Sequence, residues 1–330
     1  MRRRAFLASV IGLASLRAEA EGANTEGATI TVNSIPVATM QAAADTGGEI
    51  HLSRGNLRFA GGVVTGAAHF RKPVAVNGEG TRIVGQSIED KGTFIVDANA
   101  SFTGLDIAGA TGDGIGAAFR HQSGDLIVRR TKIRRCQNGL LGPAHYVDCT
   151  LLVDDCDVFD NATGTGQTHG LYVGEIATFT CTNSRFRATN IGHHIKSRAL
   201  RTTIRNCEVG TDFNGNESYN IDVPQGGDVA MAGCHLRQGP LTDNEVMLNF
   251  AGERNPHPGG SLVVTDTVFE STSGGTGIRI HANADVVARV ENCVFNGVDV
   301  AVEGRCVMRN CQQNGRRLPD GLQRRRKASR

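Results

Sequence analysis

The chain of 330 residues contains no tryptophan, and aromatic residues make up only 5% of it. A broad β-sandwich would need more ring side chains than this to fill its interior. No two cysteines form a CxxC pair, which argues against a structural zinc site of the usual kind. Beyond the first twenty residues, no apolar run is long enough to cross a bilayer. Glycine, in contrast, occurs 42 times, and its freedom in tight turns suits narrow coils.

A short segment recurs seven times along the chain. In each copy a small residue stands two positions before an apolar one, usually after Asp or Asn. The pairs are Thr131 with Ile133, Cys156 with Val158, Ser184 with Phe186, Cys207 with Val209, Cys234 with Leu236, Thr267 with Phe269 and Cys293 with Phe295. Successive copies are 23 to 33 residues apart, which is the period of a solenoid. Because apolar residues alternate within each copy, the predicted fold is all-β, a right-handed parallel β-helix.

The two ends of the chain differ from its body. Residues 1–20 (MRRRAFLASVIGLASLRAEA) have a basic start, an apolar stretch and a small-residue exit, which together indicate an export signal. The RRAFL segment fits the twin-arginine form of that signal, and an ordinary secretory signal is the alternative. Residues 316–330 carry seven basic side chains and one acidic one, so we expect a disordered basic tail. The remaining domain, residues 21–315, is net acidic, which argues against a nucleic-acid partner.

These features predict a periplasmic or secreted protein that is monomeric and has no membrane span. Nine cysteines in such a chain would ordinarily suggest disulfides. Four of them, however, occupy the repeat position that Thr131, Ser184 and Thr267 fill in other copies. This interchange predicts a column of small side chains in which most cysteines are buried and reduced. Cys207 and Cys234 fall in adjacent coils and could form a bridge, but the odd total leaves at least one thiol unpaired.

A second strand in each coil has an inward and an outward face, because strand side chains alternate. The predicted inward set is Leu171, Val173, Ile195, Ile221, Val246, Leu248, Ile278, Ile280, Val300 and Val302. The predicted outward set is Tyr172, His194, Lys196, Asn220, Asp222, Asn249, Arg279 and His281. A slip of one residue would bury Lys196, Asp222 and Arg279 at a prohibitive cost. His193 falls inward in this register, either as a hydrogen-bonded core histidine or because the strand is bulged there.

The start of the chain body resembles a known superfamily. Residues 35–44 (IPVATMQAAA) have the pattern of a short capping helix, and the segments GGEIHL and PVAVNGEG follow as strand and turn. This arrangement resembles the pectate-lyase-like right-handed parallel β-helix superfamily over roughly residues 30–311. The resemblance implies the fold and the place of a cleft. It does not imply one activity, because the superfamily includes lyases, hydrolases, epimerases and non-enzymes.

The outward patch has the residue types that cleavage of a uronate polysaccharide by β-elimination requires. Lys196, Arg198 or Arg279 can neutralise the substrate carboxylate and stabilise the enolate-like intermediate. His194 or Lys196 can act as the base, and Tyr172 as the acid. We expect Asp222 beside Lys196 in the next coil and Tyr172 beside His194. The predicted substrate-binding residues are His169, Asn220, Asp222, Asn249, Arg279 and His281.

C5-epimerisation uses the same first half-reaction, so a lyase and an epimerase are both consistent with this patch. A glycoside hydrolase is the alternative enzyme, although Glu303 is too far from Asp222; Asp212 or Glu217 would have to approach from the preceding turn. A non-catalytic glycan-binding protein also fits the patch, and so does a plain surface ion pair between Lys196 and Asp222. The loops 160–169, 211–218 and 250–260 are expected to wall a groove. No cofactor or metal ligand is predicted, and a Ca²⁺ requirement is left open.

Overall fold

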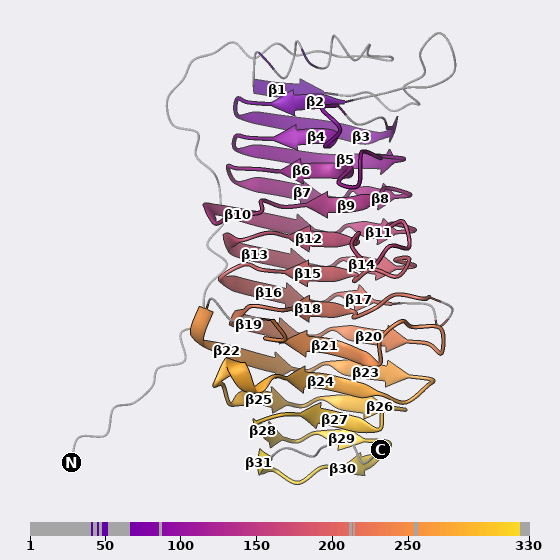
Figure 1. The fold of residues 1–330 in the computed structure, drawn as a ribbon, viewed down its shortest axis with the longest axis vertical. Helices are drawn as coiled ribbons and strands as arrows, with labels where there is room; N and C mark the ends of the chain where they lie inside the picture. Colours follow the sequence, from indigo (N-terminus) through magenta and orange to yellow (C-terminus); the bar gives the residue numbers. More distant parts are fainter. Residues whose placement is uncertain are drawn as a thin grey trace, which may run out of the picture.

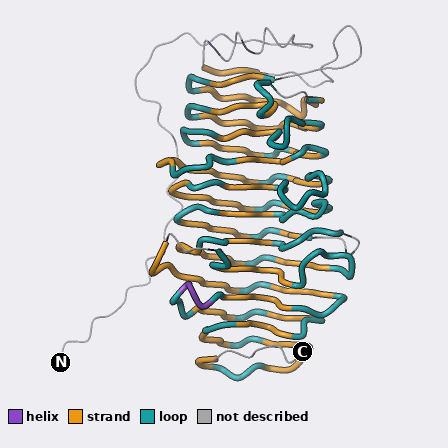
Figure 2. The backbone as a smooth tube through the Cα atoms, viewed as in Figure 1, coloured by secondary structure: helices purple, strands orange, loops and turns teal. Residues whose placement is uncertain are grey.

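The computed structural model describes residues 41, 45, 48–51, 67–85, 88–210, 213, 215–253 and 257–323. The chain is an all-β parallel solenoid of about nine turns with almost no helix, as predicted. The coils stack along one axis, from β1 (Gly48–His51) at one end to β31 (Gly321–Gln323) at the other (Figure 1). Figure 2 shows loops along the edges of this stack and the short 3-10 helix η1 (Ala282–Ala284) near its C-terminal end. The predicted export signal lies outside the described residues.

One strand of each coil belongs to a ten-stranded parallel sheet. In order, these strands are β2 (Ala68–Phe70), β4 (Gly92–Val96), β6 (Ala117–His121), β9 (Asn138–Leu141), β12 (Leu171–Val173), β15 (Ile195–Ser197), β18 (Ile221–Val223), β21 (Val246–Phe250), β24 (Thr276–Ile280) and β27 (Val300–Glu303). Each strand pairs with its equivalents in the coils before and after it. Equivalent side chains therefore stand in columns with a spacing of about 4.8 Å.

The remaining strands form a sheet of twenty-one strands, to which most coils contribute a longer and a shorter strand. The longer ones are β1, β3 (Val74–Val84), β5 (Ala100–Ala108), β7 (Leu126–Arg129), β10 (Val147–Asp154), β13 (Ile176–Thr182), β16 (Arg201–Arg205), β19 (Gly226–Ala232), β22 (His257–Thr265), β25 (Ala288–Glu291) and β28 (Cys306–Arg309). The shorter ones are β8 (Lys132–Arg134), β11 (Asp157–Phe159), β14 (Arg185–Arg187), β17 (Glu208–Val209), β20 (His235–Gln238), β23 (Val268–Ser271), β26 (Val294–Asn296) and β29 (Gln312–Gln313).

A single left-handed residue separates the longer strand from the shorter one, and it explains the Asp or Asn of the sequence repeat. The residues concerned are Arg130, Asp155, Asn183, Asn206, Gly233, Asp266, Asn292 and Asn310, with φ between 46° and 64°. Asn and Asp adopt this conformation at less cost than most side chains, and glycine at none. The recurring Asp or Asn therefore reflects a preference of the backbone at this corner, which Arg130 and Gly233 show not to be absolute.

The small residue that follows this corner is buried in every repeat, which confirms the predicted column. Its hydroxyl or thiol donates to the carbonyl oxygen two residues earlier, at 2.7 to 3.4 Å. The donors are Thr131, Cys156, Ser184, Cys207, Cys234, Thr267, Cys293 and Cys311. The carbonyl oxygen can accept a hydrogen bond from an O–H or from an S–H group at this position. Ser, Thr and Cys can therefore replace one another here. All nine cysteines are buried with free thiols.

The interior is filled by the apolar side chains of both sheets. Of the ten side chains predicted to point inward, eight are buried, while Val300 and Val302 near the C-terminal end are half-buried. Phenylalanine rings stack in the first coils, where Phe94 lies 5.1 Å from Phe102, and again where Phe269 lies 4.8 Å from Phe295. A few rings thus fill part of the interior, which is consistent with the low aromatic content.

The two ends of the solenoid are described to different extents. Of the predicted capping helix, residues 35–44, only Gln41 is described; it is helical, and its amide bonds to both the N–H and the C=O of His69 at the start of the ten-stranded sheet. At the other end, β30 (Arg316–Arg317) and β31 pair antiparallel with β29 and β28. Ordered strands therefore extend to Gln323, beyond the predicted start of a disordered tail at residue 316.

Candidate functional site

Tyr172, Lys196 and Asp222 form one outward column of the ten-stranded sheet. They are the middle residues of β12, β15 and β18, and the strands pair so that Lys196 lies between the other two. The predicted adjacency of Lys196 and Asp222 is confirmed. The predicted adjacency of Tyr172 and His194 is wrong, because Tyr172 pairs with Lys196.

Five side chains from this column and two neighbouring loops form a continuous polar network, which we call the site network: Tyr172, Lys196, Arg198, Asp222 and Glu253. Lys196 Nζ lies 3.5 Å from Asp222 Oδ2 and 3.4 Å from Glu253 Oε1. Arg198 donates from Nη2 to Glu253 Oε2 at 2.8 Å and from Nε to Tyr172 Oη at 2.8 Å. Both cations also lie within 5.8 Å of the Tyr172 ring centroid. Two cations, two carboxylates and a phenol thus meet on one face.

Exposure differs sharply between the two carboxylates. The Asp222 side chain is 3% exposed, whereas that of Glu253 is 48% exposed. Burial raises the pKa of Asp222, although the charge of Lys196 and the hydrogen bond from Asn249 act in the opposite direction. For Glu253, burial also acts to raise the pKa, but the hydrogen bond from Arg198 and the charges of both cations outweigh it, and its pKa is lowered. Glu253 is therefore the accessible carboxylate of the network, and its pKa shift favours the ionised form.

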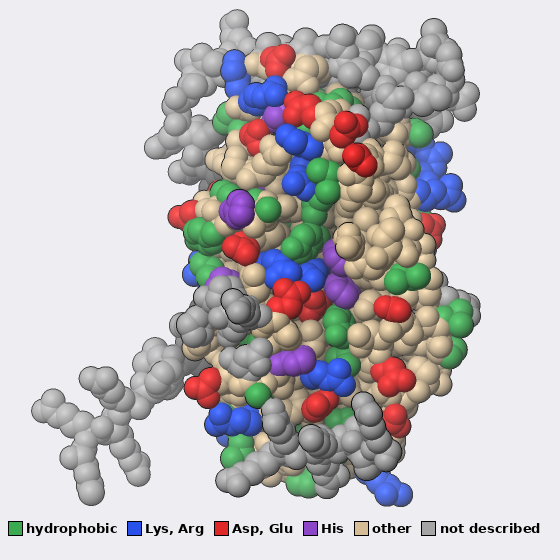
Figure 3. Space-filling model, in the orientation of Figure 1, with side chains coloured by type: hydrophobic (Ala, Val, Ile, Leu, Met, Phe, Trp, Pro, Cys, Tyr) green, Lys and Arg blue, Asp and Glu red, His purple; other side chains and the backbone are tan. Residues whose placement is uncertain are grey.

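Asn249 and His281 extend the network along the solenoid axis. Asn249 Nδ2 donates to Asp222 Oδ1 at 2.8 Å, and its Oδ1 lies 2.9 Å from His281 Nε2. Arg279, in the same column as Asn249, pairs with Glu303 at 2.7 Å. On the face seen in Figure 3, positive, negative and histidine side chains gather near the middle of the molecule and continue toward its C-terminal end. Three predicted substrate-binding residues thus lie in a row beyond Asp222.

A stack of rings lines the side of the site network. The rings of His169 and His193 are nearly parallel with centroids 4.7 Å apart, and Tyr219 follows 5.0 Å from His193. Backbone N–H groups of His193 and Tyr219 donate to Nδ1 of His169 and His193, respectively, so the neutral rings carry their proton on Nε2. Burial and the charges of Lys196 and Arg198 lower the pKa of His169 to about 3. Burial and the neighbouring His169 lower the pKa of His193 to about 2, so both are neutral at physiological pH.

Two residues predicted on the outer face instead lie inside the coil. His194 and Asn220 are 0% exposed, while His193, predicted to point inward, stacks on the outside. The cause is a bend directly before β15 and β18, where the alternation of strand side chains stops. His194 and Ile195 are consequently both buried. A local departure from strand geometry, one of the two explanations considered for His193, accounts for its position.

The loops contribute unequally to the site. Glu253 lies in the loop predicted at 250–260, but its role was not predicted from the sequence, because an acidic residue in an irregular loop carries no periodic signal. Glu217, which was expected to approach Asp222 for hydrolysis, is 0% exposed and lies inside the coil beside His194. Asp212, the other residue considered for that role, lies outside the described residues.

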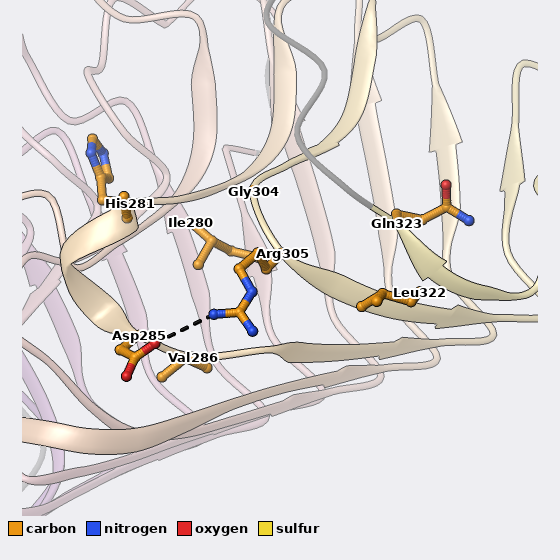
Figure 4. Close-up of a pocket in the computed structure, with 9 residues that line it drawn as sticks. Ile280, His281, Asp285, Val286, Gly304, Arg305, Leu322 and Gln323 are labelled. Carbon is orange, nitrogen blue, oxygen red and sulfur yellow. Dashed lines mark hydrogen bonds and ion pairs between the residues drawn. The ribbon is translucent and has the colours of Figure 1, made fainter.

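A hollow of about 470 Å³ lies near the C-terminal end of the solenoid, between η1 and β31 (Figure 4). Ile280, Val286 and Leu322 supply apolar walls, and its charged residues Asp285 and Arg305 pair with each other at 3.3 Å. The hollow also includes His281, the end of the row that begins at Asp222. The hollow thus adjoins the row of residues that begins at Asp222. Its two charged side chains are already paired with each other, so the site network remains the candidate site.

The described residues contain no group of three or more His, Cys, Asp or Glu side chains arranged to hold a metal ion. Nor does any helix in the described part of the chain have the length and apolar character to span a membrane. The fold and site define a parallel β-solenoid with a charged network on one sheet. No protein-family model and no curated protein matches the chain.

Among solved structures, the chain is similar to the one described as Geobacillus virus E2 ORF18, with a TM-score of 0.61 and 14% sequence identity. The match covers 86% of this chain and 60% of that one, so the present chain spans less than two thirds of its length. At this level of identity the similarity concerns the fold alone.

Proposed function

We propose that the chain is a carbohydrate-active enzyme of the pectate-lyase-like superfamily that cleaves or epimerises a uronate-containing polysaccharide at the site network. The observation that supports this proposal most directly is the binding of Glu253. Arg198 and Lys196 hold an exposed carboxylate between them, and Arg198 contacts both of its oxygens, at 2.8 and 3.1 Å. A substrate carboxylate has the same geometry and charge, so it can take the place of Glu253 between these two cations.

Tyr172 is the group best placed to move a proton beside such a carboxylate. Its oxygen accepts a hydrogen bond from the Arg198 cation, which stabilises the negative charge that this oxygen carries when Tyr172 acts as a base. In β-elimination, the phenolate would take the proton from the carbon next to the carboxylate. A carbon–carbon double bond then forms, the glycosidic carbon–oxygen bond breaks, and the proton passes to the leaving oxygen. Lys196 and Arg198 stabilise the enolate-like charge that develops on the carboxylate.

The test is incubation of the purified protein with a panel of acidic polysaccharides, with ultraviolet absorbance as the readout for unsaturated products. We expect Tyr172→Phe to lower turnover about 10²–10⁴-fold while binding is retained, since it removes a proton-transfer group. Lys196→Ala is expected to lower turnover by a similar factor through loss of charge stabilisation. Arg185→Ala, on the other sheet, is the matched control. A folded Tyr172→Phe or Lys196→Ala protein with normal turnover would remove the assignment.

Hydrolysis is the second candidate, because the two carboxylates of the network have pKa values shifted in opposite directions. Asp222, with its raised pKa, would be the acid, and Glu253, with its lowered pKa, the base or nucleophile. New reducing ends without ultraviolet absorbance would identify this reaction. Binding of an acidic polysaccharide without any product would instead identify a non-catalytic glycan-binding protein.

A further inference from the structure

A buried polar cluster lies inside the coil, beneath the ring stack and separate from the site network. It contains His194, Glu217 and Asn220, each 0% exposed. Within the described chain, Glu217 Oε1 and Oε2, Asn220 Oδ1 and His194 Nε2 have no hydrogen-bond partner. A buried carboxylate without compensation carries a large free-energy cost, and buried acceptors without donors are rare in folded proteins.

Two of the unpartnered atoms lie close together, and the amide of Asn220 neighbours one of them. His194 Nε2 is 3.7 Å from Glu217 Oε1. A Cβ added at Gly210 would lie 3.2 Å from Glu217 Oε1 and 2.6 Å from Asn220 Nδ2, so the two side chains are neighbours inside the coil. The Asn220 amide is oriented by its Nδ2, which donates to the carbonyl oxygen of Arg237 at 2.9 Å, and this leaves Oδ1 as the unpartnered atom.

The distance between imidazole and carboxylate is informative. At 3.7 Å the two atoms are too far apart for a hydrogen bond. Two ligands that each lie about 2.1 Å from one tetrahedral ion are about 3.4 Å apart, which is close to this separation. Thr189 Oγ1 lies 2.7 Å from His194 Nδ1 and can accept its proton, which leaves a lone pair on Nε2. Metal-binding histidines are usually oriented by such a contact to the second ring nitrogen.

We propose that His194 Nε2 and Glu217 bind one divalent transition-metal ion, Zn²⁺ or Mn²⁺, inside the solenoid, with the unpartnered Oδ1 of the neighbouring Asn220 as the third protein ligand. The imidazole nitrogen favours these ions over Ca²⁺, and the carboxylate and amide oxygens suit them. The ion would tie the bend before β15 to the bend before β18. The same two bends hold the outer ring stack, because His193 precedes His194 in the chain and Tyr219 precedes Asn220. The ion is thus structural, and the proposal is independent of the reaction at the site network.

The test is metal analysis of the purified, unchelated protein by mass spectrometry, followed by EDTA treatment and addition of single metals. We expect one equivalent of Zn²⁺ or Mn²⁺ per chain, a fall in the thermal midpoint with EDTA, and recovery with either ion but not with Ca²⁺. Glu217→Gln should lose the metal, while the surface control Glu253→Gln keeps it. Thr189→Val should weaken metal affinity about 10–100-fold through loss of the orienting contact.

Two outcomes would overturn the proposal. One is a wild-type protein that takes up neither Zn²⁺ nor Mn²⁺, or takes up Ca²⁺ alone, in which case the cluster is a buried ion pair or a site of another kind. The other is a Glu217→Gln protein that retains the same stoichiometry. Because the first outcome is measured on the unmodified protein, a variant that fails to fold does not leave the question open.

Discussion

At the scale of single residues, Glu253 has the greatest bearing on ligand binding. It is the most exposed member of the site network, yet both cations of the network are bound to it. A ligand carboxylate must therefore compete with a carboxylate that the protein supplies itself. The stronger the ion pairs of Glu253 with Lys196 and Arg198 are, the weaker the site binds an acidic ligand.

Replacing Glu253 by Gln should strengthen the binding of an acidic oligosaccharide by up to about fivefold, because exposed ion pairs are worth up to ~1 kcal/mol. Isothermal titration calorimetry at low salt measures this change. Glu208→Gln is the control, since Glu208 pairs with Arg185 on the other sheet. Weaker binding by the Glu253→Gln protein would mean that the cations do not receive a ligand carboxylate.

The residue scale also shows where prediction from the sequence ends. The adjacency of Lys196 and Asp222 is predictable, because both lie within strands whose period of two is unambiguous. The prediction exchanges His193 and His194 between outside and inside, since they precede β15 and strand alternation does not extend into a bend. Glu253 is not predictable at all, because its contact with Lys196 joins a loop to a strand two coils away.

At the scale of the structural element, the corner between the longer and shorter strands is the unit that repeats. Its left-handed residue and its buried small residue recur from Arg130 with Thr131 to Asn310 with Cys311. This unit was predictable as a pattern, because both positions restrict the residue type. The backbone conformation behind it was not predictable, since Asp and Asn also occur in turns that need no positive φ.

Asn206 provides a direct test of this corner, with φ of 52°. Asn206→Gly should leave the thermal midpoint nearly unchanged, because glycine adopts this conformation without strain. Asn206→Val should destabilise the coil by about 1–2 kcal/mol, the cost of a left-handed conformation for a residue with a branched Cβ. Calorimetry of the two variants gives the comparison. Equal thermal midpoints for the Asn206→Gly and Asn206→Val proteins would show that the left-handed conformation does not restrict the residue type at this corner.

At the scale of the whole molecule, the C-terminal strands close the solenoid. Each coil exposes unpaired backbone groups until the next coil covers them, and the last coil is covered by β30 and β31, which run antiparallel to it. An uncovered edge of this kind readily pairs with another chain. The segment that looked like a basic extension in the sequence therefore contains the strands that end the stack.

A chain that ends at Gly315 should self-associate, whereas a chain that ends at Gln323 should behave like the full-length protein. The first lacks both covering strands, and the second keeps them while losing the same basic residues 324–330. Light scattering after size-exclusion chromatography distinguishes the two. Equal masses per particle for both truncations would mean that β30 and β31 do not protect the edge.

Glu253 follows β21, yet it contacts Lys196 on β15, two coils earlier. Because each repeat of a solenoid contacts only its neighbours, a whole repeat can be added without altering the contacts within the others. A duplication between β15 and β21 would move Glu253 away by a further ~4.8 Å and separate it from both cations. Duplications near either end would leave these contacts intact. Descendants of this chain should thus vary in length at their ends and keep a constant number of repeats at the centre.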